Sequence, residues 1–425
     1  MPHLLDMQKL ITFLQGSPTA WHAVANMRQQ LDKRGFTPLH ESETWKLKHG
    51  KGYYVVRDGS SLIAFVIPRK AIHSAKVAAS HTDSPAFKLK PNAPFVKEGM
   101  LMLGVDIYGG PLLNSWLNRD LGIAGRIFSR GKNNSLVETL VNIADSPVVI
   151  PQLAIHLDRD VNTQGLVLHK QNHLAALAKL DCKDDKEAGL YLSKLLGVKD
   201  ILSSDLFLYP IEPPAFVGPK KEMLAAYRID SLCSVHSILE AFLASSTPAE
   251  NTLKLCAFWD NEEIGSATAQ GASSPFFSET VERLIYALNG TRADYLRIVS
   301  SSLCVSVDLG HGVHPNYADK HEPQHKVKLG QGITLKYSAQ QRYASTAATA
   351  GYIKALCGKN KIPFQELVGR GDLSSGSTIG PIHANLTGMP TVDIGIPQLS
   401  MHSARELIAC SDQAAMTKLI ECYYS

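Results

Sequence analysis

The 425-residue sequence lacks several features that would assign it to a particular class of protein. It has no unbroken run of about 20 apolar residues, so nothing in it predicts a membrane-spanning helix. Its 43 basic and 39 acidic residues give a net charge of only +4, which argues against a nucleic-acid or membrane partner. Internal repeats and low-complexity segments are also missing. We therefore expect a soluble globular protein.

Cysteine is scarce, and its spacing predicts neither disulfides nor a thiol site. The seven cysteines are scattered, none forms a Cys-x-x-Cys pair, and several lie inside apolar runs. Such a pattern is typical of reduced thiols, and the first residues do not resemble an export signal, so we expect a cytoplasmic protein. The Gly-x-Ser-x-Gly pattern of a nucleophile elbow is missing too, which argues against a serine hydrolase.

The pattern of predicted secondary structure changes between Lys88 and about Gly218. In this region short strand-like segments are separated by turns, and a proline-rich stretch at 209–219 follows. Examples of these segments are Ile123–Phe128, Leu136–Val141 and Leu166–His169. After residue 219, helices and strands alternate, as in a sheet covered by helices. We predict an α/β catalytic domain of residues 1–90 and 220–425, interrupted by a smaller, mostly β domain at 91–219.

Polar residues follow four short apolar segments that are predicted to be strands. Lys76–Ser80 runs into His81 and Asp83; Leu253–Phe258 precedes Glu262 and Glu263; Leu303–Val307 precedes Asp308; and Thr391–Ile394 leads to His402. If these strands are parallel, their carboxyl ends meet at one edge of a sheet, where open α/β sheets bind ligands. The sequence thus predicts a single site.

The adjacent carboxylates Glu262 and Glu263 are the most informative pair, because a purely structural role does not explain two charges directly after a buried strand. Neighbouring side chains diverge, so one glutamate can hold a metal while the other moves a proton to or from a water molecule. From Ile264 onward the sequence is compatible with a helix.

Single residues at the predicted site also have structural interpretations. His81 and Asp83 have two interpretations: His81 binds a metal while Asp83 fixes its ring, or the two residues form an ordinary structural pair. Asp308 competes with His311 and His314 as the ligand after its strand, and the spacing does not choose among them. Two further candidates have local alternatives: His402 as the start of the C-terminal helix, and Asp230 as the N-cap of a helix over 231–242.

Taken together, two histidines and three carboxylates with a spare glutamate form the ligand set of a hydrolase with two divalent metal ions. Zinc suits these ligands best, and manganese or cobalt is the alternative in one of the two sites.

Seven motifs, in order along nearly the whole chain, resemble those of the aspartyl aminopeptidase family of metallopeptidases (metallopeptidase family eighteen). They are His81-Thr-Asp-Ser-Pro, Arg228-Ile-Asp, Asp260-Asn-Glu-Glu-Ile-Gly-Ser, Ser306-Val-Asp with His314-Pro-Asn-Tyr, Gln341-Arg-Tyr-Ala, Gly376-Ser-Thr-Ile-Gly-Pro and Leu399-Ser-Met-His-Ser. The resemblance implies a three-layer α/β/α zinc-exopeptidase-like domain with a mixed sheet, and a dodecamer built from dimers through the inserted domain. It also implies removal of N-terminal Asp or Glu from peptides.

The resemblance also implies a role for each candidate. His81 binds one metal, Asp230 bridges both, and Glu263, Asp308 and His402 complete the sites. Glu262 is the general base, supported by Asp83. His156, expected on a strand at 153–158, reaches a neighbouring subunit's active site; a metal ligand and a solvent-facing histidine are the alternatives.

Two further residues are candidates for substrate binding. Lys336 corresponds to the basic residue that recognises an acidic side chain, with a solvated surface lysine as the alternative. Gly376 begins a stretch whose backbone N–H groups suit a substrate main chain. Two rival functions share these motifs: a related aminopeptidase with neutral or deblocking preference, and a non-enzymatic peptide-binding scaffold.

Overall fold

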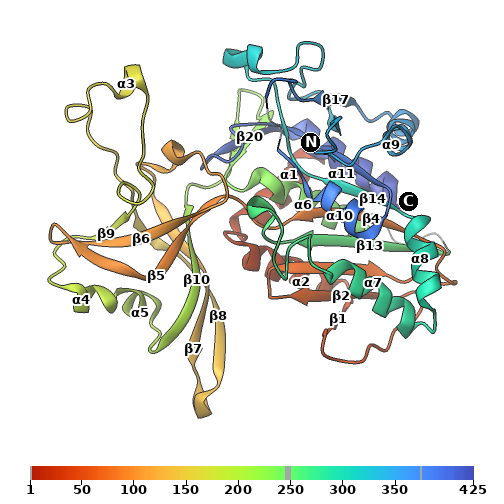
Figure 1. Cartoon of the computed structure of the whole chain (residues 1–425), viewed down its shortest axis with the longest axis horizontal. Helices are drawn as coiled ribbons and strands as arrows, with labels where there is room; N and C mark the ends of the chain where they lie inside the picture. Colours follow the sequence, from red (N-terminus) through yellow and green to blue (C-terminus); the bar gives the residue numbers. More distant parts are fainter. Residues whose placement is uncertain (1, 245–249, 374–375) are drawn as a thin grey trace. The chain divides into compact units, whose positions relative to one another are not determined.

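The computed structural model describes residues 2–244, 250–373 and 376–425, and its contacts separate these into two units (Figure 1). The first contains the described residues of 1–83, 214–401 and 406–425; the second contains 84–213 and 402–405. The sequence predicted a similar discontinuous arrangement, with its boundaries at 90/91 and 219/220. The four residues 402–405 were not expected to join the second unit.

A nine-stranded mixed sheet organises the first unit (Figure 1). Its order is β1 (Thr37–Leu39), β2 (Gly52–Arg57), β3 (Ser61–Val66), β13 (Thr252–Trp259), β4 (Ser74–His81), β14 (Leu303–Val307), β18 (Thr391–Gly395), β16 (Ile333–Tyr337) and β17 (Phe364–Val368). The four central strands β13, β4, β14 and β18 run parallel to one another. Their carboxyl ends therefore lie along one edge, as the sequence predicted.

Alternation of side chains along the central strands makes both faces of this sheet apolar. On β13, Leu255 and Ala257 belong to one buried cluster, whereas Cys256 and Phe258 belong to the other. Because successive strand residues point to opposite faces, a strand that is apolar throughout must be covered on both sides. The β13 sequence therefore requires helices on both faces of the sheet.

Helices supply this cover from different parts of the chain. One cluster includes residues of α1 (Pro2–Gln15), α2 (Ala20–Lys33), α6 (Ile229–Ala244), α9 (Ala347–Asn360) and α11 (Cys410–Tyr424). The other includes residues of α7 (Phe276–Ala287), α8 (Arg292–Ser300) and α10 (Ile379–Thr387). The result is three layers, α/β/α, and the predicted fold class is confirmed.

Two smaller sheets complete the chain. In the first unit, five short strands pair in the order β11 (Ala215–Val217), β12 (Met223–Ala226), β20 (Glu406–Ala409), β19 (Pro397–Leu399) and β15 (Gly310–His311). The second unit is a six-stranded antiparallel sheet with short helices α3 (Val161–Gln164), α4 (Asp185–Gly189) and α5 (Tyr191–Leu196). Its order is β8 (Leu136–Val148), β7 (Leu121–Arg130), β10 (Ile201–Pro210), β5 (Ala86–Lys97), β6 (Met100–Tyr108) and β9 (Ala176–Lys179).

Several local predictions were wrong. Residues 166–169 form no strand, and His156 lies in a turn rather than on a strand. No helix continues from Ile264: a single 3-10 turn there is followed by further turns until α7 begins at Phe276. The C-terminal helix begins at Cys410, so His402 precedes it by several residues. In each case the local pattern was too short to exclude a turn.

None of the helices in the described part of the chain combines the length and the apolar character needed to span a bilayer.

Candidate metal centre

The ends of three parallel strands bring together three of the predicted site residues, His81, Asp308 and Glu262. His81 is the last residue of β4 and pairs in register with Trp259, the last residue of β13. Asp308 directly follows β14, and Glu262 lies on the 3-10 turn Glu262–Ile264 that follows β13. Strand register thus sets which side chains meet, because parallel neighbours end at the same level of the sheet.

A tight turn after β13 presents the two glutamates. Asn261 adopts a left-handed conformation with φ 64°, which asparagine tolerates better than most residues, and Gly265 has φ 94°. Asp83 holds the turn between them, because its carboxylate accepts the backbone N–H of Glu262 at 3.1 Å and that of Glu263 at 3.1 Å. One carboxylate therefore fixes the backbone of both glutamates.

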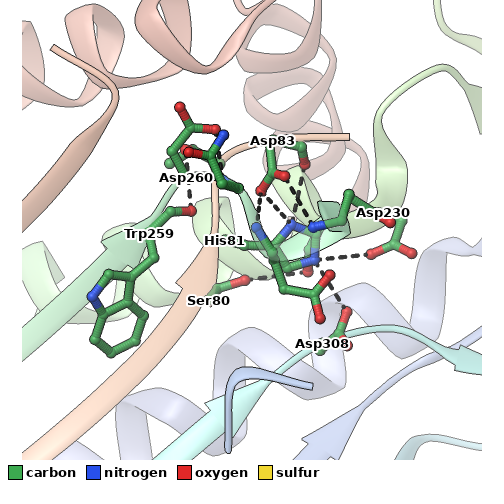
Figure 2. Close-up of polar contacts among 12 residues, drawn as sticks. Ser80, His81, Asp83, Asp230, Trp259, Asp260 and Asp308 are labelled. Atoms are coloured by element: carbon green, nitrogen blue, oxygen red, sulfur yellow. Dashed lines mark hydrogen bonds and ion pairs between the residues drawn. The ribbon is translucent and has the colours of Figure 1, made fainter. Parts of the chain in front are cut away.

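The His81 ring lies among three carboxylates (Figure 2). Its Nδ1 is 3.3 Å from Asp83, while its Nε2 is 3.4 Å from Oδ1 of Asp230 and 3.4 Å from Oδ1 of Asp308. The ring is only 1% exposed. Asp83 thus faces one ring nitrogen and two separate elements of the fold face the other, an arrangement typical of a metal-binding histidine and its outer carboxylate.

These distances suit a zinc ion between the ring and the carboxylates. Two ligand atoms that each lie about 2.1 Å from a tetrahedral zinc are roughly 3.4 Å apart. The separations from His81 Nε2 to Asp230 and to Asp308 have this value. Glu263 extends the cluster, because ligand atoms of His81, Asp230 and Glu263 all lie within 4.8 Å of one another. Imidazole nitrogen and carboxylate oxygen are also donors that zinc accepts.

Asp230 is positioned by residues whose role the sequence did not reveal. It stands at the N-terminal end of α6 in a non-helical conformation, and its N–H donates to the buried Glu406 carboxylate at 3.0 Å. The buried Arg228 donates to the Thr82 carbonyl, next to His81. Arg228 lies in a motif that had been recognised, but Glu406 acts from β20, more than 170 residues away in the sequence.

The carboxylates are crowded enough to change their acidity. Burial, together with the Asp308, Asp83 and Asp230 carboxylates, raises the pKa of Glu262 to about 8. Burial and the carboxylates of Asp230 and Glu262 raise the pKa of Glu263 well above its usual range. Like charges in a desolvated space repel one another, and a bound cation would relieve that repulsion. The donor set therefore fits a divalent metal.

The same carboxylates also raise the pKa of His81, because they stabilise its protonated, cationic ring. Burial opposes protonation of the ring, but Asp230, Asp308 and Asp83 raise its pKa well above the usual value. A metal ion that occupied the space beside Nε2 would replace the ring proton, because only neutral imidazole binds metals.

Lys336 lies in the core of this region and not on the surface. It is 1% exposed, donates to the Leu309 carbonyl at 2.7 Å and lies 3.5 Å from Asp308 Oδ2. The alternative of a solvated surface lysine is therefore wrong. Gly376 is exposed.

A cavity of about 370 Å³ lies near Lys336, since Tyr343 lines it and the Lys336 ammonium is 5.4 Å from the centre of the Tyr343 ring. Four histidines and two basic side chains line the cavity: His311, His314, His321, His325, Lys320 and Arg370. Of these, His311 and His314 were weighed as metal ligands. The structure places them in the cavity wall, whereas Asp308 faces His81.

Backbone contacts determine where two of these histidines carry their protons. His314 Nδ1 accepts the Asn316 N–H at 3.2 Å, so its proton is on Nε2. His321 Nε2 accepts the His314 N–H at 3.2 Å, so its proton is on Nδ1. Each ring therefore carries its N–H on the nitrogen that does not accept a backbone N–H. Neither His321 nor Arg370 had been assigned a role, because no local pattern connects them.

Two predicted site residues belong to the second unit. His156 lies in the turn at residues 155–157, and its side chain is exposed. His402 has a left-handed φ of 64°, and its Nδ1 lies 3.1 Å from the Gly110 carbonyl oxygen. The other predicted metal ligands, His81, Asp230, Glu263 and Asp308, all lie in the first unit.

Comparison with known proteins gives matches over almost the whole chain. Residues 13–424 match the family described as Aminopeptidase I zinc metalloprotease (M18). A probable M18 family aminopeptidase 2 from Clostridium novyi is 39% identical over 426 residues, 98% of each chain. A solved chain of the Ape4 and Nbr1 complex is 30% identical with a TM-score of 0.95, and the match covers 100% of this chain and 86% of that one. The S. cerevesiae mApe1 dodecamer is 28% identical with a TM-score of 0.83, covering 98% and 95%.

Proposed function

Because the chain belongs to the M18 family of zinc metallo-aminopeptidases, we propose that it removes N-terminal aspartate and glutamate from peptides with two divalent metal ions. The observation that carries this proposal is the placement of His81 Nε2 at 3.4 Å from carboxylate oxygens on two other elements, Asp230 and Asp308. We assign zinc to these sites, with manganese or cobalt as the alternative in one of them. In this assignment His81, Asp230, Glu263, Asp308 and His402 would hold the metals, and Asp230 would serve both of them.

Glu262 is the proposed general base. It directly precedes Glu263, its backbone N–H donates to Asp83, and the carboxylates of Asp308, Asp83 and Asp230 lie near enough to raise its pKa. When bound, the metal ions would lower the pKa of a water molecule and polarise the scissile carbonyl. Glu262 would take the proton from the attacking water and pass it to the leaving amine. Backbone N–H groups near Gly376 would bind the substrate main chain.

The cavity near Lys336 supports the proposed preference for acidic residues. Its wall presents the Nε2–H of His314, the Nδ1–H of His321 and the cationic groups of Lys320 and Arg370. Arg370 is paired with Asp372, and Glu322, the carboxylate in the lining, is paired with His325. N–H donors and cations favour a carboxylate guest over an apolar one. We therefore propose that the substrate's acidic side chain occupies this cavity.

The protein is further proposed to be a cytoplasmic homo-oligomer, in which the second unit contributes contacts and His156 reaches a neighbouring subunit. One similar solved structure is an S. cerevesiae mApe1 dodecamer, which supports a dodecamer here. Strand β8, at one end of the six-stranded sheet, exposes Leu136, Val137 and Leu140 with 63%, 42% and 39% of their surface accessible. Exposed apolar side chains on an edge strand are typical of a contact surface.

A substrate panel tests the proposed function. The zinc-loaded protein is given the 4-nitroanilides of Asp, Glu, Ala and Leu, together with N-acetyl-Asp anilide as the blocked control. We expect cleavage of the Asp and Glu compounds at least about 10-fold more efficiently than the neutral ones, since one charge-assisted contact is worth about 1.5–3 kcal/mol. The blocked compound should resist cleavage. Faster cleavage of Ala or Leu would favour a neutral aminopeptidase, and cleavage of the acetylated compound would favour a deblocking enzyme.

A further inference from the structure

Three helices that cover one face of the nine-stranded sheet enclose a second cavity. Helices α1, α6 and α11 pack against one another (Figure 1), and the space between them measures about 360 Å³. Every residue of its wall comes from these three helices. None of the proposed metal ligands and none of the residues assigned to the substrate lines it. The cavity is therefore separate from the site described above.

His236 contributes an unsatisfied ring to this cavity. It lies on α6, is 6% exposed and lines the cavity, and its ring centre is 5.7 Å from that of Phe13. Within the described residues its ring makes no hydrogen bond, and of its two nitrogens only Nδ1 is enclosed by protein, so Nε2 is the nitrogen that can meet a guest. Burial lowers the pKa of His236 to about 4, so the ring is neutral near pH 7. With the proton on Nδ1, Nε2 is a hydrogen-bond acceptor.

Gln413 contributes a second unmatched group, and its orientation is fixed. Its Nε2 donates to the Cys233 carbonyl at 3.0 Å and to Ser237 Oγ at 2.8 Å. Turning the amide over would place its oxygen against the Cys233 carbonyl, where two acceptors would face each other. The amide oxygen Oε1 has no hydrogen-bond partner in the part of the chain that the structure describes. Since Gln413 is 3% exposed and lines the cavity, α11 also supplies an acceptor that lacks a donor.

The charged side chains of the wall include one more carboxylate than ammonium group. Lys9 pairs with Glu240 at 2.9 Å and lies 4.0 Å from Asp6. Lys418 lies 3.8 Å from Glu421. Three carboxylates thus share two ammonium groups. A cationic guest would balance the remaining negative charge, whereas an anionic guest would add to it.

We propose that this cavity binds a small organic ammonium compound, a protonated primary amine, held by the His236 ring and the Gln413 amide oxygen. An ammonium group only donates hydrogen bonds, so it matches two acceptors that lack donors, and its charge matches the excess of carboxylate. An apolar guest would leave both acceptors without a donor. A cavity of about 360 Å³ is at the small end of the range for ligand sites, which suits a compound of few atoms. This inference does not depend on the proposed function.

Calorimetric titration of the full-length protein with putrescine tests the proposal. The matched ligand control is 1,4-butanediol, which has the same carbon chain but carries hydroxyl groups in place of the ammonium groups. We expect saturable binding of putrescine with a Kd of about 1 mM or tighter, and binding of butanediol at least about 10-fold weaker, because charged donors form stronger hydrogen bonds. Equal affinity for the two compounds would overturn the proposal, and so would the lack of putrescine binding up to about 10 mM.

Variants of the wall test where putrescine binds. His236→Phe removes the ring acceptor and should weaken binding about 10-fold or more. The matched control is His383→Phe: His383 is also buried, its Nε2 has no partner among the described residues, and it lies outside this cavity. The Kd of the control should stay within about 3-fold of wild type.

A third variant keeps the test decisive if His236→Phe does not fold. Ala414 lines the cavity from a partly exposed position, so Ala414→Leu narrows the space without removing a hydrogen bond of His236 or Gln413. It should also weaken putrescine binding about 10-fold or more, because the added side chain occupies the volume of the guest. A folded Ala414→Leu protein that binds putrescine as tightly as the wild type would overturn the proposal.

Discussion

Replacing Asp83 by asparagine should reduce catalysis strongly, although Asp83 is not itself proposed to bind a metal. Its carboxylate accepts the N–H groups of Glu262 and Glu263, at 3.1 Å each, and lies 3.3 Å from His81 Nδ1. Asparagine has nearly the same shape but offers one acceptor and one NH₂ group. The NH₂ group would face either a backbone N–H or the ring nitrogen of His81.

The expected magnitude follows from these contacts. Hydrogen bonds to a charged group contribute about 1.5–3 kcal/mol each, and at least one is lost in the variant. We take about 2–3 kcal/mol as the cost to the arrangement of the two glutamates. Since about 1.4 kcal/mol corresponds to a tenfold change in rate, kcat/KM should fall roughly 30- to 150-fold.

The assay measures kcat/KM on Asp-4-nitroanilide, bound zinc and the urea midpoint for the Asp83→Asn variant. Asp412→Asn is the matched control, because the buried Asp412 carboxylate also accepts two backbone N–H groups, those of Gly330 and Gly332, at 2.7 Å each. The control should lose stability to a similar degree, as its urea midpoint will show. Its kcat/KM, measured without urea, should stay near that of the wild type. If Asp83→Asn keeps kcat/KM within about 3-fold of wild type, the positioning role assigned to Asp83 is wrong.

Four further outcomes are expected. Glu262→Gln should keep its zinc, measured by elemental analysis, while turnover falls about 100-fold or more, whereas Glu263→Gln should lose zinc as well; equal zinc loss in both would contradict their separate roles. Removing zinc with a chelator should abolish activity and lower Tm, and restoring zinc should reverse both changes. If Tm does not depend on zinc, the folded protein does not have the proposed zinc site. Burial lowers the pKa of His383 to about 4, so the unfolded chain binds this proton first as pH falls. The stability that this histidine contributes is complete above about pH 6.5 and is lost as the pH falls toward 4; at pH 5 the loss is about 2 kcal/mol. The free energy of unfolding of His383→Phe, measured with urea, should therefore depend less steeply on pH than that of the wild type. Finally, subunits lacking His156 and subunits lacking Glu262 should each be nearly inactive alone but regain part of the activity in verified mixed oligomers; no recovery would mean that His156 does not serve a neighbour's site.

Sequence reasoning predicted the parts of this protein that depend on local order along the chain. Strand β13 could be recognised because its residues are apolar on both faces, and its end was marked by the change to Trp259-Asp260-Asn261. The polar residues placed after β13, β4, β14 and β18 suggested that these strands run parallel, as they do, but their order in the sheet was not predicted. Local patterns also failed where they were short, as at residues 166–169, because a few alternating residues suit a turn as well as a strand.

Only the tertiary structure decided which of the neighbouring candidates meet. The sequence could not choose between Asp308 and the two histidines that follow it, because all three lie on one short loop; strand register placed Asp308 beside His81 and the histidines in the cavity wall. Lys336 was buried by packing against residues of other strands. Composition and motif order are local properties that the chain carries before it folds. Burial and charge pairing arise between segments far apart in the sequence, so they exist only once the sheet has formed.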